Sequence, residues 1–587
     1  MGELLDKMLA RKGKTRDDIH PSSNIAKRQR EAGIRETKEL LRIAGLPRRR
    51  WEDEDVEMLQ EEITDWLKTP QGEWTLRAVQ AFALAELHDL QGLLGIILVG
   101  GGKTLVTYLA PLVLEVQRPV LLVPAGLRDK THRDFEMLSK HFVGHHDLEI
   151  VSYEKLSRVS GANYLEERQP DLIIADECHK LKNLDAAVTR RVGRYLDDEE
   201  PQRAIFCGLS GTITQRSIMD YWHLLRWALG RQKMPLPAKQ SEAIQWSRAL
   251  DEKLRGATRV GTGALRVFVP GAGETEEVKR DRAREGYSRR LVETPGVVAT
   301  KASDVDASII GSCWSPTLTQ PILDAIHHLY EEWETPGGEI CRQPVDVWRH
   351  ARELVCGFYY KWDPEPPEEW LKARRRWFKY VREILKRRTD GLDSPLQVSN
   401  ACKRGWLNSG HRYEDWEKIK KTCKVNNVPV WVDDGVLKQV IKQVSSKHKT
   451  IVWVEQVATG EKLAELSGWA FFGRQGLDPD GRYIEEIAGK ETIIASISAN
   501  GTGRNLQAWA HNEILTPPPN GRILEQCMGR THREGQQADE VTFRFMLGSS
   551  AVRAGLQQAI RDARYIEQTT GTIQKLLLAG LDLGPVL

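Results

Sequence analysis

The pattern of apolar and polar positions divides the chain into stretches of different kinds. From about residue 73 to 230, short apolar runs alternate with helical stretches: GIILV (95–99), PVLLVP (119–124), LEIVSY (148–153), DLIIAD (171–176) and RAIFCGLSG (203–211). The alternation resumes near residue 432, with TIVWVEQ (450–456), TIIASISA (492–499), EILTP (513–517) and VTFRFML (541–547). Apolar strands alternating with helices are typical of parallel sheets covered on both faces. The pattern predicts an α/β protein with two parallel-sheet lobes, at 73–230 and 432–550.

The remaining stretches are predicted to be mostly helical. Residues 1–72 form a highly charged N-terminal extension, 231–431 a long insert between the lobes, and 551–587 a C-terminal tail. In the extension, a helix that ends before Pro70 has one apolar face, formed by Val56, Leu59, Ile63 and Leu67. These assignments complete a five-part division of the chain.

A basic, aromatic helix is predicted in the insert at EEWLKARRRWFKYVREILKRR (368–388), after Pro366 and Pro367. Four large side chains fall on one face, namely Trp370, Trp377, Val381 and Ile384. We expect this face to pack in the core of the insert. The arginines and lysines on the other faces either meet water or contact the phosphates of DNA.

Composition narrows the class of protein. The 587 residues, 40% hydrophobic and 28% charged, are typical of a globular protein of about three to four domain-sized units. The net charge of +3 does not by itself indicate a polyanionic partner. No apolar run reaches the about 18 residues of a membrane span, and no signal peptide begins the chain. The eight cysteines form no C-x-x-C pair, which argues against structural zinc and favours a reducing, cytoplasmic compartment.

A glycine loop follows the first predicted strand, formed by Gly100, Gly101, Gly102, Lys103 and Thr104. Such a loop before a helix lets backbone N–H groups approach phosphates, with the lysine on the β- and γ-phosphates and the threonine hydroxyl on Mg²⁺. The longer G-x-x-x-x-G-K-[ST] pattern is not met, because Ile97 replaces its first glycine. The loop alone is also compatible with a tight turn.

Two adjacent carboxylates, Asp176 and Glu177, end the predicted strand DLIIAD. Ligands in open α/β sheets bind beyond this edge, so Asp176 would hold Mg²⁺ and Glu177 would orient and deprotonate the attacking water. A solvated turn is the alternative for an isolated Asp-Glu pair. The order of the two motifs, each at a strand end, favours a site for ATP and Mg²⁺. His179 has no second ligand at suitable spacing and is expected to couple this site to the interlobe cleft.

Taken together, ADECHKLKN after the glycine loop resembles motif II of superfamily-two helicases, in the Swi/Snf-type branch of ATP-dependent DNA translocases. LRAVQ (76–80) is similar to the glutamine motif, in which Gln80 would read the adenine edge. LLVPAGL (121–127), VSYEKL (151–156) and LSGT (209–212) resemble further motifs of the first lobe. SANGTGRNL (498–506), which contains Gly503 near the nucleotide, and QCMGRTHREGQ (526–536) resemble motifs V and VI. The resemblance implies two RecA-like lobes.

Motif VI supplies two arginines, Arg530 and Arg533, which three-residue spacing would place on one helical face. Guanidinium groups stabilise the charge that develops on a transferring phosphoryl group. These residues lie about 430 positions after Lys103, so they would reach the nucleotide only if the second lobe closes on the first. A solvated basic helix end is the alternative.

The function expected from these features is ATP-driven translocation on double-stranded DNA in replication, recombination or repair. The compact plan resembles bacterial or phage members of the branch, which places the protein in the cytoplasm of a bacterium or infected host, with the nucleus as the alternative. The sequence leaves open a strand-separating DNA or RNA helicase. A nucleotide-gated DNA-binding clamp is a third alternative, which the intact Lys103, Glu177, Arg530 and Arg533 argue against. Motif V reads NGTGRN and departs from the more glycine-rich string of the branch.

Overall fold

The computed structural model describes most of the chain: residues 33–49, 53–98, 100–197, 204–252, 259–269, 275–300, 305–341, 343–387, 392, 394–424, 426–444 and 447–581. The first part of the predicted N-terminal extension and the end of the predicted tail lie outside these ranges, as do Arg388 and Val99.

A six-stranded parallel sheet forms the first lobe, in the order β3-β2-β4-β5-β1-β6. Its strands are β1 (Leu93–Ile96), β2 (Pro119–Val123), β3 (Glu149–Ser152), β4 (Leu172–Asp176), β5 (Ile205–Leu209) and β6 (Val297–Ala299). Successive residues of β4 face opposite layers, since Ile173 and Ala175 pack on one side and Leu172 and Ile174 on the other. Both faces of the sheet are therefore buried, which explains its continuous apolar strands.

Helices cover the two faces of this sheet. One layer contains α5 (Asp53–Leu67), α6 (Ala78–Leu90), α7 (Lys103–Val113) and α8 (Arg128–Leu138). The other contains α4 (Lys38–Ala44), α9 (Tyr153–Ser157), α10 (Tyr164–Arg168), α11 (Ala187–Asp197), α12 (Trp222–Lys233), α13 (Gln240–Leu250) and α14 (Glu276–Val292). The helix predicted before Pro70 is confirmed as α5.

A second six-stranded parallel sheet forms the second lobe, in the order β11-β12-β10-β13-β14-β7. Its strands are β7 (Ser308–Trp314), β10 (Thr450–Val454), β11 (Ala470–Phe472), β12 (Ile493–Ser496), β13 (His511–Ile514) and β14 (Glu540–Met546). Around it lie α15 (Gln320–Glu332), α16 (Pro344–Val355), α20 (Gly435–Gln443), α21 (Val457–Ser467), α22 (Ile484–Ile487), α23 (Ile497–Asn500), α24 (Gly521–Thr531), α25 (Ser550–Thr570) and α26 (Lys575–Leu578). The predicted α/β fold with two parallel sheets is confirmed.

The boundaries drawn from the sequence do not coincide with the edges of the sheets. Residues 231–431 contribute β6 to the first sheet and β7 to the second, so both sheets extend into the predicted insert. Strand β6 has three residues, and in β7 only Ile309 is buried while the other positions are exposed or half-buried, so neither has a long apolar run. The division into domains otherwise stays a prediction.

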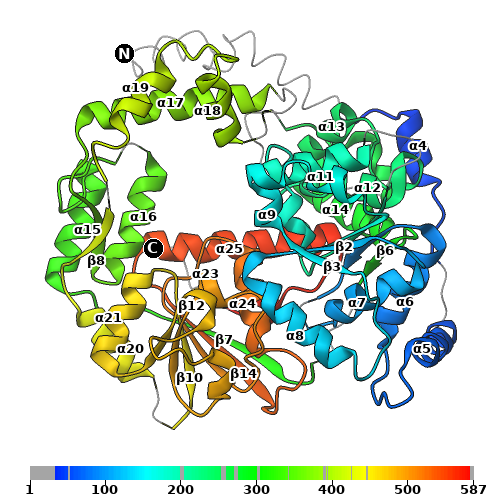
Figure 1. Ribbon diagram of the computed structural model, residues 1–587. Helices are drawn as coiled ribbons and strands as arrows, with labels where there is room; N and C mark the ends of the chain where they lie inside the picture. The colour runs from blue at the N-terminus through cyan, green and yellow to red at the C-terminus, as the bar shows by residue number, and fades with distance from the viewer. Residues whose placement is uncertain are drawn as a thin grey trace.

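Three helices of the predicted insert form what we call the arm: α17 (Glu368–Lys386), α18 (Pro395–Lys403) and α19 (Arg412–Ile419). The arm begins and ends at an antiparallel pair, β8 (Phe358–Asp363) and β9 (Asn426–Trp431). Trp377, Val381 and Ile384 of α17 form a small core with α18, as predicted, whereas Trp370 is partly exposed. Figure 1 shows the arm at the top of the molecule, away from both sheets.

Short 3-10 helices occur at 125–127, 159–161, 178–181, 218–220, 263–268 and 474–476.

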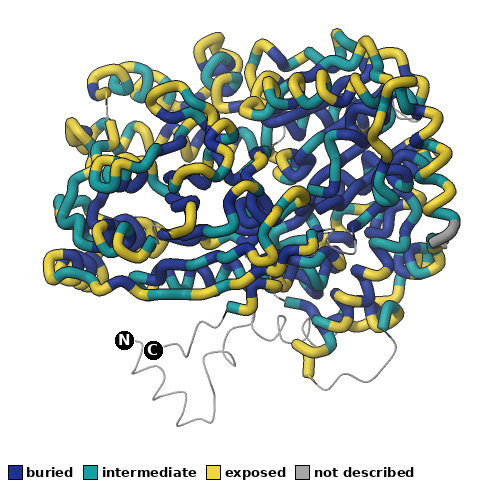
Figure 2. The backbone as a smooth tube through the Cα atoms, turned by 90° about the horizontal axis from the view of Figure 1, so that it is seen from below, coloured by how far each residue is buried: buried dark blue, intermediate teal, exposed yellow. Residues whose placement is uncertain are grey.

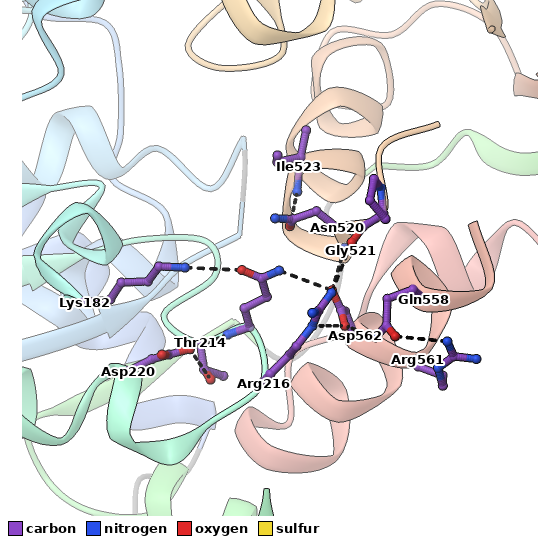
Figure 3. A network of polar contacts seen from close by, with 12 residues as sticks. Lys182, Thr214, Arg216, Asp220, Asn520, Gly521, Ile523, Gln558, Arg561 and Asp562 are labelled. Carbon is purple, nitrogen blue, oxygen red and sulfur yellow. Dashed lines mark hydrogen bonds and ion pairs between the residues drawn. The ribbon is translucent and has the colours of Figure 1, made fainter. Parts of the chain in front are cut away.

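Helix α25 connects the lobes. It crosses the molecule between the two sheets (Figure 1) and packs on α24 and α14. Its fully buried Asp562 accepts hydrogen bonds from the Arg216 guanidinium of the first lobe, at 2.6 and 2.9 Å, and from the backbone N–H of Gly521, at 3.3 Å (Figure 3). One carboxylate thus joins α25, the start of α24 and the first lobe.

Burial follows this architecture. Buried residues concentrate in the strands and in the helices that cover them, and exposed residues lie at the periphery (Figure 2). Among the helices that the structure describes, none is both long and apolar enough to cross a membrane.

Candidate functional site

A pocket of about 660 Å³ lies where the two lobes meet. Of the residues predicted for the site, ten line it: Gln80, Gly100, Gly102, Lys103, Thr104, Asp176, Glu177, Gly503, Arg530 and Arg533. Gly101 is absent from the lining. The structure therefore brings together side chains from two separate sheets, although their chemical roles stay predictions.

The glycine loop curves because two of its residues adopt left-handed backbone conformations. Gly100 has φ 96° and Gly102, which precedes α7, has φ 74°. A Cβ on Gly102 would lie 1.9 Å from Nε2 of Gln80, so no larger residue fits without displacing that side chain. The loop thereby opens the start of α7, with its unpaired N–H groups, toward the pocket.

Lys103 is held inside this loop. Its Nζ donates hydrogen bonds to the carbonyl oxygens of Ile97, at 3.0 Å, and Leu98, at 3.2 Å. Burial lowers the pKa of the Lys103 ammonium, against the opposing charges of Glu177 and Asp176. The amine is thus within the field of both carboxylates.

Gln80 supports the loop from α6. Its Oε1 accepts a hydrogen bond from the backbone N–H of Arg77, at 2.8 Å, and its Nε2 donates to the carbonyl of Gly102, at 3.1 Å. Both ends of the Gln80 amide are thus engaged by the chain itself, and its contact with adenine stays a prediction. Arg77, which the sequence reasoning did not select, donates to the carbonyl of Gly100 at 2.9 Å and forms an ion pair with Glu534 of the second lobe. Its place in the segment LRAVQ was the available signal.

The two carboxylates follow β4 directly. Glu177 has φ 57°, a left-handed conformation rare outside glycine, and its N–H donates to Oδ1 of Asp176 at 3.0 Å. Burial and the nearby Glu177 raise the pKa of Asp176 to about 7, with Lys103 opposing. Burial also acts to raise the pKa of Glu177, but the hydrogen bond with His179 and the charge of Lys103 outweigh it and hold that pKa below its usual range. The pair thus has distinct proton affinities.

A short polar network orients Glu177. His179 Nδ1 lies 2.9 Å from the hydroxyl oxygen of Ser210, and that hydroxyl lies 3.1 Å from Oε2 of Glu177. Burial lowers the pKa of His179 to about 4, with the Glu177 hydrogen bond opposing and Arg522 of α24 adding to the shift. The imidazole is thus neutral at pH 7, and it acts on Glu177 as a hydrogen-bond partner. The expected coupling of His179 to the other lobe stays a prediction, which the nearby Arg522 supports.

Arg530 and Arg533 reach the pocket by different backbone routes, which corrects the prediction of one helical face. Helix α24 ends at Thr531, and His532 after it is non-helical, with ψ 85°. Arg533 therefore lies beyond the helix, because the chain turns at His532. The two guanidinium groups nevertheless converge, since both donate to the carbonyl of Arg504, at 3.3 and 3.1 Å. Burial lowers the pKa of Arg530 to about 10.

His532 is fixed at this turn by two contacts that sequence reasoning missed. Its Nε2 lies 2.7 Å from the carbonyl oxygen of Ala307, and its Nδ1 lies 3.1 Å from Nζ of the buried Lys575 in α26. Since a carbonyl only accepts, Nε2 carries the proton and Nδ1 accepts from the lysine. No local motif marks Lys575, which lies far from His532 in the sequence.

Gly503 lies at a close contact between the lobes. With φ 75° it adopts a left-handed conformation, and a Cβ there would lie 2.1 Å from Cδ2 of Leu127 in the first lobe. A side chain at this position would therefore displace the side chain of Leu127 and would also be strained by the left-handed backbone. The backbone conformation and the nearby Leu127 thus both favour glycine at position 503, and its contact with nucleotide stays a prediction.

The chemistry of the pocket fits a nucleotide and Mg²⁺. Its volume lies within the range of about 300–1,000 Å³ for ligand pockets. No cluster of three or more His, Cys, Asp or Glu residues suited to a metal exists in the described ranges. Mg²⁺ is commonly held by one or two carboxylates together with phosphate oxygens and water. Thr104 and Asp176 are the residues that would hold it.

Comparison with protein-family models gives no match to this chain, and a search of curated proteins gives none either.

Proposed function

We propose that this protein is an ATP-hydrolysing motor that translocates on double-stranded DNA, with RecA-like lobes of the superfamily-two, Swi/Snf-type kind. The observation that carries the proposal is the interlobe pocket. There Lys103, Asp176 and Glu177 of the first lobe face Arg530 and Arg533 of the second. A solvated turn or a solvated basic helix end could explain either motif alone. Neither explains why five chemically matched groups from the two lobes line one pocket.

Each residue of the first lobe has a role in this proposal. The glycine loop and Lys103 bind the phosphates, and Thr104 with Asp176 hold Mg²⁺, which neutralises phosphate charge when bound. Glu177 orients the attacking water and accepts its proton. The low pKa of Glu177 keeps it ionised at neutral pH, as a base requires.

The second lobe completes the site in this proposal. Arg530 and Arg533 stabilise the charge on the transferring phosphoryl group, and they do so only while the lobes are closed. The close contact of Gly503 with Leu127 and the ion pair of Arg77 with Glu534 support a closed state. Hydrolysis and release then alternate with lobe movement, which is the coupling that a motor needs.

Duplex DNA is the favoured track because of the string GRTHREGQ (529–536), which is similar to motif VI of the DNA-translocating branch. We propose a role in replication, recombination or repair. A reducing, cytoplasmic location is proposed with it, since all eight cysteines are free. A strand-separating helicase and a nucleotide-gated clamp remain the alternatives that the experiment must separate.

The test is ATP hydrolysis measured with duplex DNA, single-stranded DNA and RNA as separate activators. We expect strong stimulation by duplex DNA, together with movement on the duplex in a triplex-displacement assay. The Glu177→Gln variant, purified in parallel, controls for contaminating ATPases. Stimulation by RNA or single strands alone, with unwinding, would instead establish a helicase. Nucleotide-dependent DNA binding without hydrolysis would establish the clamp.

A further inference from the structure

Helix α17 of the arm has a strongly basic surface. Seven of its side chains and its C-cap residue are basic and exposed, against three exposed acidic side chains. The basic ones are Lys372, Arg374, Arg375, Arg376, Lys379, Arg382, Lys386 and Arg387, and the acidic ones are Glu368, Glu369 and Glu383. Such a local excess contrasts with a chain whose net charge is only +3.

Four of these cations form a single row, which we call the basic stripe: Arg375, Lys379, Arg382 and Lys386. At 3.6 residues per turn they lie within about 60° of one another and extend over about 16 Å of helix. The opposite face carries Trp377, Val381 and Ile384, which are buried in the arm core. The packing of α17 therefore directs the basic stripe away from the arm core and into solvent.

The basic stripe has no evident part in holding the fold. Arg375 and Arg382 each donate from Nε to a carbonyl oxygen four residues earlier in α17, both at 3.2 Å. Within the described ranges, neither Lys379 nor Lys386 forms an ion pair with a carboxylate. Four unneutralised cations along one row repel one another, which disfavours the arrangement unless an anion binds there.

The arm is attached to both lobes. At one end, β8 and β9 join it to α16 and the second lobe. At the other end, Arg190 of α11 in the first lobe donates hydrogen bonds to the carbonyl oxygens of Leu385 and Leu392, the latter at 3.0 Å. In Figure 1, α17 lies at the top of the molecule and α25 near its middle, with α15 and α16 to the left and α9 and α11 to the right. A ligand on the basic stripe would therefore be held in a fixed relation to the two lobes.

We propose that the basic stripe binds the phosphate backbone of duplex DNA, as a contact additional to those of the two lobes. This inference rests on the proposed function. One strand of duplex DNA carries a phosphate about every 3.4 Å along the axis, so about 16 Å of helix faces roughly five phosphates. The charge and length of the stripe match such a polyanion, and binding would release condensed counterions. Bridged to both lobes, the arm would hold the track beside them.

The test compares two charge-reversed proteins of equal net charge. In one, the stripe is altered by Lys379→Glu and Arg382→Glu. In the matched control, Lys442→Glu and Lys449→Glu alter exposed lysines on α20 and just before β10, in the second lobe. Binding to a fluorescent duplex is measured over a salt series, with single-stranded DNA and RNA as further arms, and ATPase is measured with and without duplex. A Lys379→Gln, Arg382→Gln variant excludes effects of the introduced carboxylates.

We expect the stripe variants to bind duplex at least about tenfold more weakly and the slope of log affinity against log salt to fall by about 2, because two phosphate contacts are lost. ATPase without DNA and the thermal unfolding midpoint should be unchanged, and the control should bind like wild type. Equal losses of DNA affinity in the stripe variant and the control, or no loss in either, would rule out the basic stripe as a DNA contact. Stimulation of the wild-type ATPase by duplex DNA would in that case still support the proposed motor. If duplex DNA neither stimulates nor binds wild type, the proposed function itself fails. Weakening for single strands or RNA but not for duplex would also overturn the inference.

Discussion

At the scale of single residues, Asp251 is a buried acid whose surroundings disfavour its charged form. Its carboxyl group is buried at the end of α13 and accepts hydrogen bonds from the Ser217 hydroxyl, the Ile218 N–H at 3.0 Å and the Tyr565 hydroxyl at 2.9 Å. Burial raises the pKa of Asp251 to about 7, although these three hydrogen bonds oppose the shift. Because Tyr565 belongs to α25, the protonation state of Asp251 affects a hydrogen bond between α25 and the first lobe.

The raised pKa predicts a loss of stability with rising pH. An unfolded aspartate has a pKa of about 3.9, so from about pH 4 upward the unfolded chain releases this proton before the folded one does. The contribution of Asp251 to the free energy of unfolding is thus fully present below pH 4. It declines by about 1.4 kcal/mol per pH unit until about pH 7. Asp251→Asn keeps an acceptor for Ile218 and Tyr565 but has no charge. Between pH 5 and 8, the thermal unfolding midpoint of wild type should fall relative to that of this variant and level off above pH 7. If the midpoints of the two proteins change in parallel with pH, the pKa of Asp251 is not raised.

Substitutions at two other single residues should impair nucleotide binding and hydrolysis in different ways. Lys103→Ala removes part of the phosphate-binding loop, so nucleotide affinity and turnover should fall together. Glu177→Gln leaves that loop intact and removes the base, so ATP and Mg²⁺ should still bind while turnover falls by a factor of about 100 or more. Nucleotide titration and steady-state hydrolysis on both proteins separate the effects. Near-normal turnover in Glu177→Gln would remove Glu177 from the role of base.

At the scale of elements, the contact of α25 with the first lobe depends on one buried carboxylate. Asp562 has no exposed surface, and its partner Arg216 keeps 23% of its side chain exposed. Gln558, one turn earlier on α25, also donates to Asp562 at 2.8 Å (Figure 3). Removal of Asp562 would leave the Arg216 cation and the Gly521 N–H without this acceptor.

Asp562→Ala should therefore destabilise the protein by roughly 2–4 kcal/mol, a value reduced from that of a fully buried pair because Arg216 meets solvent. Arg561→Ala on the same helix is the matched control, since Arg561 bonds Gln558 at the surface and its loss should change stability little. Thermal unfolding of both variants checks this. Equal midpoints for the two would show that Asp562 does not join the lobes.

The elements also show what the sequence could predict. Strands β2, β4, β10 and β12 are buried on both faces, and their unbroken apolar runs were recognised. Edge strands β6, β7 and β11 were missed, because they are short or partly exposed. The pairing partners of β6 and β7 also lie about 200 residues or more away along the chain. The antiparallel β8 and β9 were missed for the same reason, with pairing across about 70 residues.

The site follows the same rule. Residues in local motifs, such as Lys103 and Glu177, were identified because strand, loop and helix are contiguous there. The end of α24 before Arg533 and the contact of Lys575 with His532 were not predictable, since tertiary packing determines both. A local pattern reports backbone conformation and chemistry, whereas long-range partners leave no periodic signal in a single sequence.

At the scale of the whole molecule, the candidate site exists only where the lobes meet. Arg530 and Arg533 come from one lobe, and Lys103, Asp176 and Glu177 from the other. Within the described residues, the Nε of Arg533 is buried and has no hydrogen-bond partner, which leaves a donor near the pocket. The geometry predicts that binding and catalysis are separable.

Arg530→Ala and Arg533→Ala should each leave ATP affinity within a few-fold of wild type, because the first lobe supplies most of the ground-state contacts. Turnover should fall by roughly 10³, the scale of a lost arginine finger, and translocation should stop while DNA still binds. Nucleotide affinity, DNA affinity and turnover are measured on each variant. Normal hydrolysis with weakened DNA binding would instead make these arginines contacts to DNA.

Strand β7 has a consequence for how the protein is made. It leaves the ribosome about 230 residues before β14, the strand with which it pairs at the edge of the second sheet. At a synthesis rate of about 5–20 residues per second, β7 waits roughly 10–50 s for that partner. The six strands of the first sheet, by contrast, are complete at residue 299. A nascent chain therefore carries a finished first lobe and an unpaired strand edge, the kind of surface that chaperones bind and that aggregation exploits.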